Sequence, residues 1–207
     1  MDSKSYKKIN TELPIESTPL TLDDLKALIP KYITTKTELY DAEFKNISEV
    51  SNNYFLSKKK FQFTIYSLYK VHKEMFNKVW KWAGEKRKIE KNIGVNVIYI
   101  DIELKKLLDN LDYWLDQNTP VLDISAYLHH RLVYIHPFNN GNGRWARLIV
   151  NIFLKDQLNS YLKFPENKLL LTNEIRKNYI NALQEADKLN YHHLIKFHKK
   201  YISESNI

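Results

Sequence analysis

Cysteine is absent from this chain of 207 residues, and glycine and proline are scarce, with four and six residues respectively. The absence of cysteine excludes disulfide bonds, thiolate metal sites and cysteine nucleophiles, and it leaves the redox compartment open. So few helix-breaking residues, combined with long stretches of helical periodicity, predict a mainly α protein. The length and the 43% hydrophobic content are sufficient for one substantial core.

Long apolar runs are missing as well. The longest one, residues 148–154, is interrupted by Asn151 and is far too short to span a bilayer. The first eight residues are polar and lack the apolar core of a signal peptide. We therefore expect a soluble, cytoplasmic protein without a membrane partner.

The formal net charge of +8 is typical of proteins with nucleic-acid or other acidic partners. The lysines are scattered, however, and residues 58–60 form the only run of three. A genome that favours lysine, isoleucine and asparagine codons is the simpler explanation, so nucleic acid is not expected as the partner.

The most informative segment is His136-Pro-Phe-Asn-Asn-Gly-Asn-Gly-Arg-Trp-Ala-Arg147. Because a proline follows it, His136 is expected in a loop and not on a packed helix face. The glycines of residues 141–143 allow a tight turn, and the amides that begin the next helix favour an anion. Arg144 and Arg147 add forked donors that match phosphate geometry. A base beside a phosphate-binding turn indicates phosphoryl or nucleotidyl transfer.

This segment resembles the motif of the Fic family (filamentation induced by cAMP), His-x-Phe-x-(Asp/Glu)-Gly-Asn-Gly-Arg-x-x-Arg. The matching residues are His136, Phe138, Gly141, Asn142, Gly143, Arg144 and Arg147. The exception is Asn140, which stands where the family carries the acidic residue that holds magnesium. This variant and the N-terminal segment are most similar to a bacterial subgroup known as mobile mystery protein B. The likeness covers roughly residues 20–200 and is sharp around residues 129–147.

The resemblance implies a Fic-fold helical bundle with a small β-hairpin flap. It also implies an adenylyltransferase that moves AMP from ATP to a Ser, Thr or Tyr hydroxyl of a target protein. His136 would be the general base. Residues 141–143 would bind the phosphates, with Asn142 donating to the same charge. Arg144 and Arg147 would hold the pyrophosphate portion of ATP.

Asn140 is the main departure from the family pattern. Magnesium usually needs at least one carboxylate beside the substrate phosphates. An asparagine keeps the carbonyl oxygen but loses the charge, so Mg²⁺ is expected as a weakened cofactor. The alternatives are transfer of another phosphate-containing group, and an interaction protein that binds nucleotide without catalysis. We expect an enzyme, because the histidine, the glycine turn and both arginines are intact.

The chain is predicted to divide into an extended N-terminal arm (1–20) and a single helical domain (21–207). The domain would have N-terminal helices over about 21–56 and a core over about 57–203. Apolar spacings predict helices at about 21–30, 37–54, 60–82, 101–115, 124–135, 173–189 and 191–201, besides the helix that follows the motif.

Residues 86–100 alternate loosely around Gly94, which predicts the hairpin. In the family a target segment pairs with the edge of this flap, so Ile93, Gly94 and Val95 are the docking candidates. An ordinary surface hairpin is an equally good interpretation.

Fic proteins are often silenced by a helix carrying (Ser/Thr)-x-x-x-Glu-(Gly/Asn), whose glutamate pairs with the second motif arginine. Glu43 lies on the expected N-terminal helix, but Leu39 and Phe44 replace the hydroxyl residue and the glycine. Inhibition by Glu43 is therefore one hypothesis, and a solvent-facing glutamate is the alternative.

Two pairs of adjacent histidines, at 129–130 and 192–193, invite a metal interpretation. Adjacent helical residues point about 100° apart, so neither pair can easily chelate one ion. An antitoxin-like partner and self-association are left open.

Overall fold

The computed structural model describes residues 22–33, 35–169 and 173–203, which are predominantly helical. The arm predicted over residues 1–20 lies outside the described residues. The elements are α1 (Leu22–Ala27), α2 (Lys36–Leu56), α3 (Ile65–Phe76), η1 (Val97–Tyr99), α4 (Ile100–Asp116), α5 (Val121–Ile135), α6 (Asn142–Leu158), α7 (Glu166–Leu169), α8 (Glu174–Asp187) and α9 (His192–Tyr201). Within this described part, no helix combines the length and the apolar character needed to cross a membrane.

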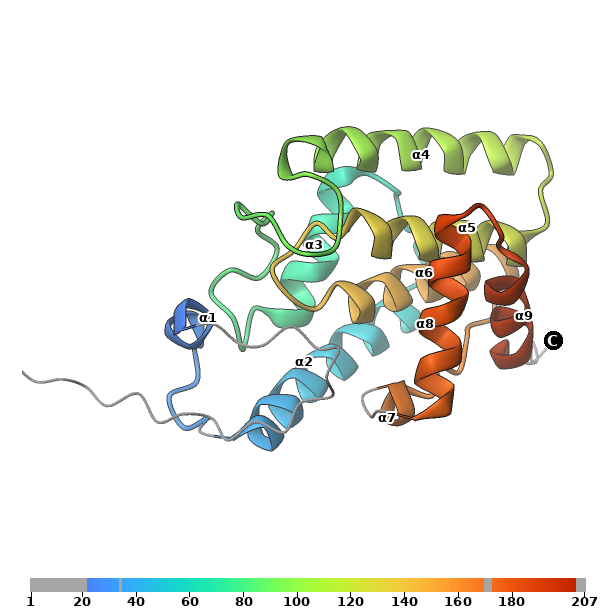
Figure 1. The fold of residues 1–207 in the computed structure, drawn as a ribbon. Coiled ribbons are helices and arrows are strands. Elements are labelled where there is room, and N and C mark those ends of the chain that lie inside the picture. Colours follow the sequence, from blue (N-terminus) through green and yellow to red (C-terminus); the bar gives the residue numbers. More distant parts are fainter. Residues whose placement is uncertain (1–21, 34, 170–172, 204–207) are drawn as a thin grey trace, which may run out of the picture.

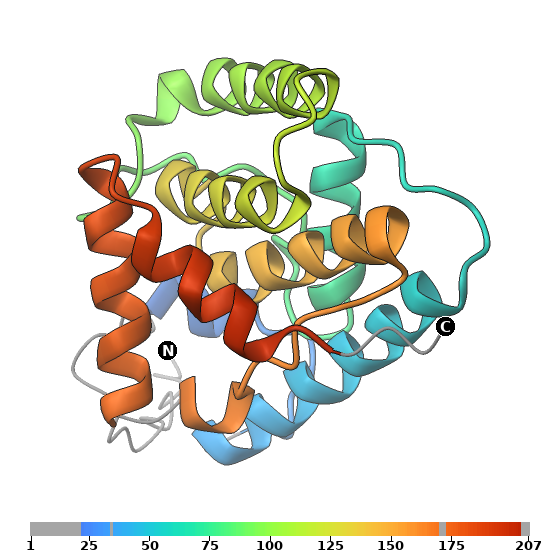
Figure 2. The same ribbon diagram turned by 90° about the vertical axis from the view of Figure 1, so that its right-hand side faces the viewer.

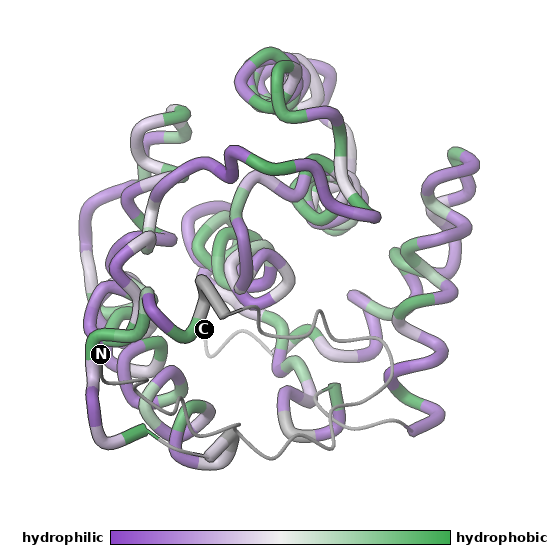
Figure 3. Tube along the Cα trace, turned by 60° about the vertical axis from the view of Figure 1, so that its left-hand side comes forward, coloured by the Kyte–Doolittle hydropathy of each residue, from purple (hydrophilic) through white to green (hydrophobic). Residues whose placement is uncertain are grey.

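Helices α5 and α6 pack against each other in the middle of the molecule, and the other helices surround them (Figure 1). Helix α4 packs on α5, α2 and α3 pack on α6, and α8 and α9 cover one end (Figure 2). Hydrophobic and hydrophilic residues alternate along the helices in Figure 3, as expected when one face of each helix is buried. The turn that joins α5 to α6 carries the motif. It is anchored by Phe138, which is 0% exposed.

Local sequence explains why α2 begins where it does. The Thr35 hydroxyl accepts a hydrogen bond from the amide of Glu38 (3.2 Å), and the Glu38 carboxylate accepts one from the amide of Thr35 (2.9 Å). This capping box satisfies two amides that the first turn leaves unpaired. The helix predicted at 37–54 is thus confirmed to within two residues.

The helix predicted at 60–82 is wrong at both ends. Thr64 caps the start of α3, which ends at Phe76. Beyond it, Val79 accepts a hydrogen bond from the amide of Ile29 (2.8 Å), and the amide of Lys81 donates to Ala27 (3.0 Å). These bonds pair residues 79–81 with the end of α1 and the segment after it, so the chain leaves the helix there although its apolar spacing continues.

The predicted β-hairpin is not confirmed. Residues 86–96, which we call the flap loop, contain no strand and make one isolated antiparallel bridge, between Lys86 and Phe138. The guanidinium group of Arg87 is the reason. It binds the carbonyl groups of Ile89 and Val95, which a hairpin would have paired with backbone amides.

Candidate active site

His136 occupies the turn at the end of α5. It is the C-cap residue, with a left-handed backbone (φ 52°, ψ 58°), so the expectation that it leaves helical geometry is confirmed. The half-buried imidazole has its Nδ1 atom 3.4 Å from the carbonyl oxygen of Val133. A carbonyl can only accept, so Nδ1 carries the proton, which leaves Nε2 with the lone pair that a general base needs.

The environment of His136 keeps its imidazole neutral. Its pKa is lowered to about 4: desolvation by burial is the largest cause, the Val133 carbonyl opposes it, and the positive charges of Arg87 and Lys91 add to the lowering. At neutral pH the ring is therefore unprotonated and able to accept a proton.

Gly141 is the N-cap of α6 and has a positive φ of 79°. A Cβ atom at this position would lie 2.5 Å from the Phe76 ring, so the turn requires glycine for both reasons. No side chain caps this end of α6. The first amides of the helix therefore point outward without a capping partner, as an anion site requires.

The side chain of Asn142 bonds to the backbone of the motif turn. It is 2% exposed, accepts from the amide of Phe138 (2.9 Å) and donates to the carbonyl oxygen of the same residue (2.8 Å). Both polar atoms of the side chain thus hold the turn closed, and its donation to phosphate stays a prediction. Its backbone amide remains part of the uncapped helix end.

His72 supports the turn from α3 and was missed from the sequence. Its Nδ1 atom accepts from the amide of Gly84 (3.0 Å), so Nε2 carries the proton and donates to the carbonyl oxygen of Asn140 (3.0 Å). The ring stacks on Phe138 with 3.6 Å between centroids. Burial lowers its pKa to about 3, so it acts as a neutral structural link.

The donor set around Asn140 does not fit a magnesium site. Its side-chain oxygen accepts a hydrogen bond from the amide of Gly141 (2.7 Å), and the motif turn offers no carboxylate. The nearby carboxylates of Glu43 and Glu166 pair with arginines. Within the described residues, no group of three His, Asp or Glu side chains is arranged to hold a metal ion.

Glu43 is buried (2% exposed) and pairs with the first motif arginine. One of its carboxylate oxygens accepts from Arg144 (2.5 Å) and the other from the indole of Trp80 (2.7 Å). The solvent-facing alternative is therefore wrong. The partner also differs from the family pattern, in which such a glutamate pairs with the second arginine.

Arg147 is held by the C-terminal half of the chain. Its guanidinium makes two hydrogen bonds to the carboxylate of Glu166 in α7 (2.6 and 2.5 Å), and Tyr179 is a further neighbour. The forked geometry fits the carboxylate as it would fit a phosphate. Both motif arginines thus engage carboxylates of the chain itself.

Tyr179 begins a buried chain of hydrogen bonds whose direction is fixed. The Ser125 hydroxyl donates to the carbonyl of Leu122, so it accepts from Nδ1 of His198 (2.7 Å). Nε2 of His198 must then accept from Nδ1 of His129 (2.9 Å), whose Nε2 accepts from Tyr179 (3.0 Å). The Tyr179 oxygen keeps its lone pairs, and the positive charge of Arg147 bears on it. His129 is thus a structural link between neutral groups.

His130, His192 and His193, the other members of the two histidine pairs, take no part in this hydrogen-bond chain as it is described above. Nε2 of His130 lies 2.8 Å from a carboxylate oxygen of Asp187, and Nδ1 accepts from the hydroxyl of Tyr191 (3.2 Å). His192 and His193 begin α9 with their rings in edge contact.

The flap loop covers the His136 side of the turn. Ile93 is 56% exposed, and the amide of Val95 donates to the carbonyl oxygen of Ile135 (3.4 Å). Gly94 has a φ of 98° and touches the histidine directly, since a Cβ atom there would lie 2.6 Å from His136 Cβ. Gly94 and Val95 therefore lie beside the predicted base, and Ile93, the third predicted docking residue, precedes them in the loop.

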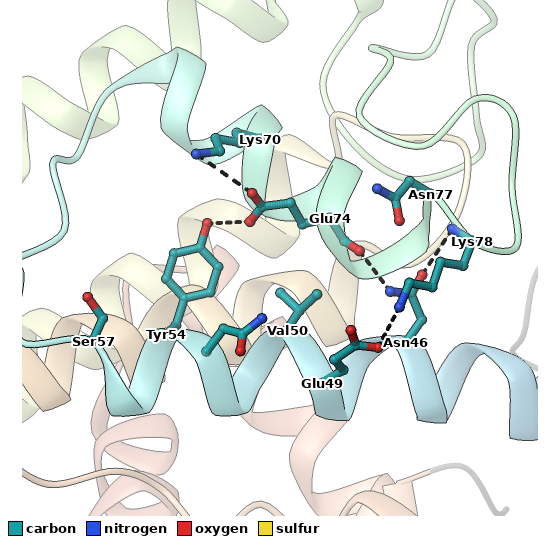
Figure 4. A pocket seen from close by; sticks show the side chains of 10 residues that line it. Asn46, Glu49, Val50, Tyr54, Ser57, Lys70, Glu74, Asn77 and Lys78 are labelled. Carbon is teal, nitrogen blue, oxygen red and sulfur yellow. Dashed lines mark hydrogen bonds and ion pairs between the residues drawn. The ribbon is translucent and has the colours of Figure 1, made fainter.

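A groove of about 390 Å³ opens between α2 and α3 and is not lined by motif residues (Figure 4). Its polar groups pair with one another: Tyr54 donates to Glu74 (2.6 Å), and Lys78 pairs with Glu49. We assign it no chemistry.

Several supporting residues could not be recognised from the sequence. They are His72, Trp80, Arg87, Glu166 and Tyr179. Each lies outside the motif, and each acts through a contact with a distant segment. Only Arg87 has a recognisable position in the sequence. It lies three residues after Gly84, the glycine that ends a helical pattern.

Comparison with known proteins agrees with this architecture. Residues 62–154 match the sequence model of the Fic/DOC family. "Protein adenylyltransferase Fic" from Nematostella vectensis is 28% identical over 149 residues, which are 68% of this chain and 35% of that protein. This chain spans about a third of the length of such curated relatives.

Solved structures show the same fold. BepC from Bartonella tribocorum, determined with bound AMPPNP, has a TM-score of 0.65 at 19% identity and covers 84% of this chain and 90% of that one. The N-terminal Fic domain of a Bartonella effector protein from Bartonella sp. AR 15-3 has a TM-score of 0.67 at 16% identity, with 90% and 95% covered. The segment that matches the Fic/DOC family model includes the motif turn.

Proposed function

We propose that this protein transfers AMP from ATP to a hydroxyl group of a target protein. The observation that carries the proposal is the α5–α6 turn, where a neutral imidazole with a free Nε2 lies next to an uncapped helix N-terminus bearing Arg144 and Arg147. Relatives named protein adenylyltransferase, and a structural neighbour with bound AMPPNP, support the choice of ATP.

In the proposed reaction the target hydroxyl oxygen attacks the α-phosphorus of ATP. Nε2 of His136 takes the hydroxyl proton as the new O–P bond forms. The bond from the α-phosphorus to the bridging oxygen breaks, and pyrophosphate leaves. The amides at the start of α6, together with the two arginines, stabilise the negative charge on the phosphates. The target carries AMP as a phosphodiester.

Both arginines must exchange a carboxylate for a phosphate before ATP can bind fully. Glu43 occupies Arg144, and Glu166 occupies Arg147. We propose that Glu43 is inhibitory for this reason, since α2 holds it buried against Trp80. The structure described here therefore corresponds to a restrained state.

We further propose that the flap loop receives the target. Ile89 (71% exposed) and Ile93 (56%) offer apolar side chains to a partner next to His136.

The Asn140 variant supports a place in the mobile mystery protein B subgroup and a weak dependence on Mg²⁺. No step of the reaction is assigned to a metal. An antitoxin-like partner and self-association stay predictions.

Incubation of the protein with cell lysate and ATP labelled at the α-phosphate tests the proposal. The Glu43→Gln protein, in which the carboxylate that holds Arg144 is removed, should label one or more proteins, and Glu43→Gln combined with His136→Ala should not. His130→Ala is a matched control, because it removes a histidine of α5 outside the motif. Binding of ATP without any labelled protein would favour the catalytically silent alternative.

A further inference from the structure

Arg87 is a fully buried cation (0% exposed) that gathers backbone carbonyl groups. Its Nε atom donates to the carbonyl oxygen of His136 (2.8 Å), Nη1 to that of Ile89 (3.2 Å) and Nη2 to that of Val95. Glu90 lies 3.5 Å from Nη1 as the charged partner, and it is largely exposed. One side chain therefore joins two points of the flap loop to the predicted base.

Backbone contacts bring the same segments together. The amide of Arg87 donates to the carbonyl oxygen of Pro137 (2.9 Å), and the amide of Val95 donates to that of Ile135 (3.4 Å). Gly94 leaves no room for a side chain against His136. The flap loop thus bonds to the residue before the histidine, to the histidine itself and to the residue after it.

We propose that Arg87 is a positioning residue, which fixes the left-handed turn at His136 and joins its imidazole to the flap loop as one unit. This inference rests on the proposed role of His136. A left-handed backbone is uncommon at a non-glycine residue and persists where the surroundings determine it. The hydrogen bond from Arg87 to the His136 carbonyl provides that constraint, with geometry that lysine cannot reproduce.

Arg87 also affects the chemistry of the base. The groups that bear on the imidazole are Arg87 and Lys91 from the flap loop and the Val133 carbonyl from α5. The two cations lower the pKa of His136 in addition to the larger effect of burial, so loss of the Arg87 charge should raise it. Two substitutions of Arg87 can therefore separate its effect on the position of His136 from its effect on the pKa of His136.

Arg87→Lys keeps the charge but loses the fork, and Arg87→Gln loses both. Lys88→Gln is the matched control, since it removes one charge from an exposed neighbour in the same loop. The pKa of His136 is measured by NMR titration of its ring proton, which is assigned by comparison with His136→Ala. We expect the wild-type pKa in Arg87→Lys and in the control, and a higher pKa in Arg87→Gln.

The kinetic readout tests the geometry. Both Arg87 variants should lower kcat about 10- to 100-fold, as a small misplacement of a reacting group does. The KM for ATP should change little, since the phosphate-binding groups lie on α6. Only Arg87→Gln should shift the acid limb of kcat/KM upward. If Arg87→Gln does not fold, the kcat of Arg87→Lys alone tests whether Arg87 positions His136.

Wild-type kcat in a folded Arg87→Lys or Arg87→Gln protein would overturn the proposal, as would an unchanged His136 titration in Arg87→Gln. If the Glu43→Gln protein transfers no AMP, the proposed function fails instead. The NMR titration does not depend on activity, and it still decides whether Arg87 controls His136.

Discussion

Glu43→Gln should increase the affinity of the protein for ATP. The substitution keeps the shape of the side chain and an oxygen that can accept from the Trp80 indole. It removes the negative charge that holds Arg144. The first motif arginine is then available to the phosphates without first leaving a buried carboxylate unpaired.

The size of the effect follows from the burial of the pair. Hydrogen bonds to charged groups contribute about 1.5–3 kcal/mol, and about 1.4 kcal/mol corresponds to a tenfold change in affinity. The Arg144 side chain is 20% exposed and that of Glu43 2%, so screening by water is limited. We expect the dissociation constant for ATP to fall about 10- to 100-fold.

Isothermal titration calorimetry with ATP measures this change, in a His136→Ala background that prevents turnover. Glu49→Gln is the control, because Glu49 lies on the same helix and pairs with Lys78 at the surface. Such exposed pairs contribute about 1 kcal/mol or less, so this variant should bind ATP like its parent. Equal affinities for the two variants, with both folded by circular dichroism, would refute the inhibitory role of Glu43.

Four further predictions follow from the site. Tyr179→Phe leaves Nε2 of the buried His129 unpaired, so it should lower the free energy of unfolding in urea by about 1–3 kcal/mol. His72 and His198 have folded-state pKa values of about 3, below the unfolded value. Their contribution to stability is therefore present above about pH 6.5 and lost as the pH falls towards 3. Urea titrations at pH 7 and pH 5 should differ by about 2 kcal/mol for each histidine. Asn140→Asp should bind Mg²⁺ more tightly than the wild type when ATP is present, by calorimetry. For His136, the acid limb of kcat/KM should lie near pH 4 and that of kcat higher, because bound phosphates raise the pKa of the base; steady-state rates between pH 4 and pH 8 measure both.

The motif turn could be predicted from the sequence because its requirements are local. Proline after His136, and a glycine at position 141 with positive φ, determine the backbone within a few residues. The amphipathic pattern likewise located α2, α5 and α6, since apolar spacing reports which face of a helix is buried.

The features that could not be predicted from the sequence depend on contacts between distant segments. The flap loop has the alternation of a hairpin, but Arg87 takes the carbonyl groups that a ladder would use. Glu43 is 101 residues from Arg144, and no spacing rule connects them. The contact of the Asn142 side chain with Phe138, which closes the turn, likewise has no signal in the sequence.

The most direct test of AMP transfer compares ATP labelled at the α-phosphate with ATP labelled at the γ-phosphate, using the Glu43→Gln protein and cell lysate. If the account is correct, only the α-label becomes attached to protein, pyrophosphate accumulates, and both signals disappear in Glu43→Gln combined with His136→Ala. Protein labelling from the γ-phosphate, or α-labelling that persists without His136, would contradict it.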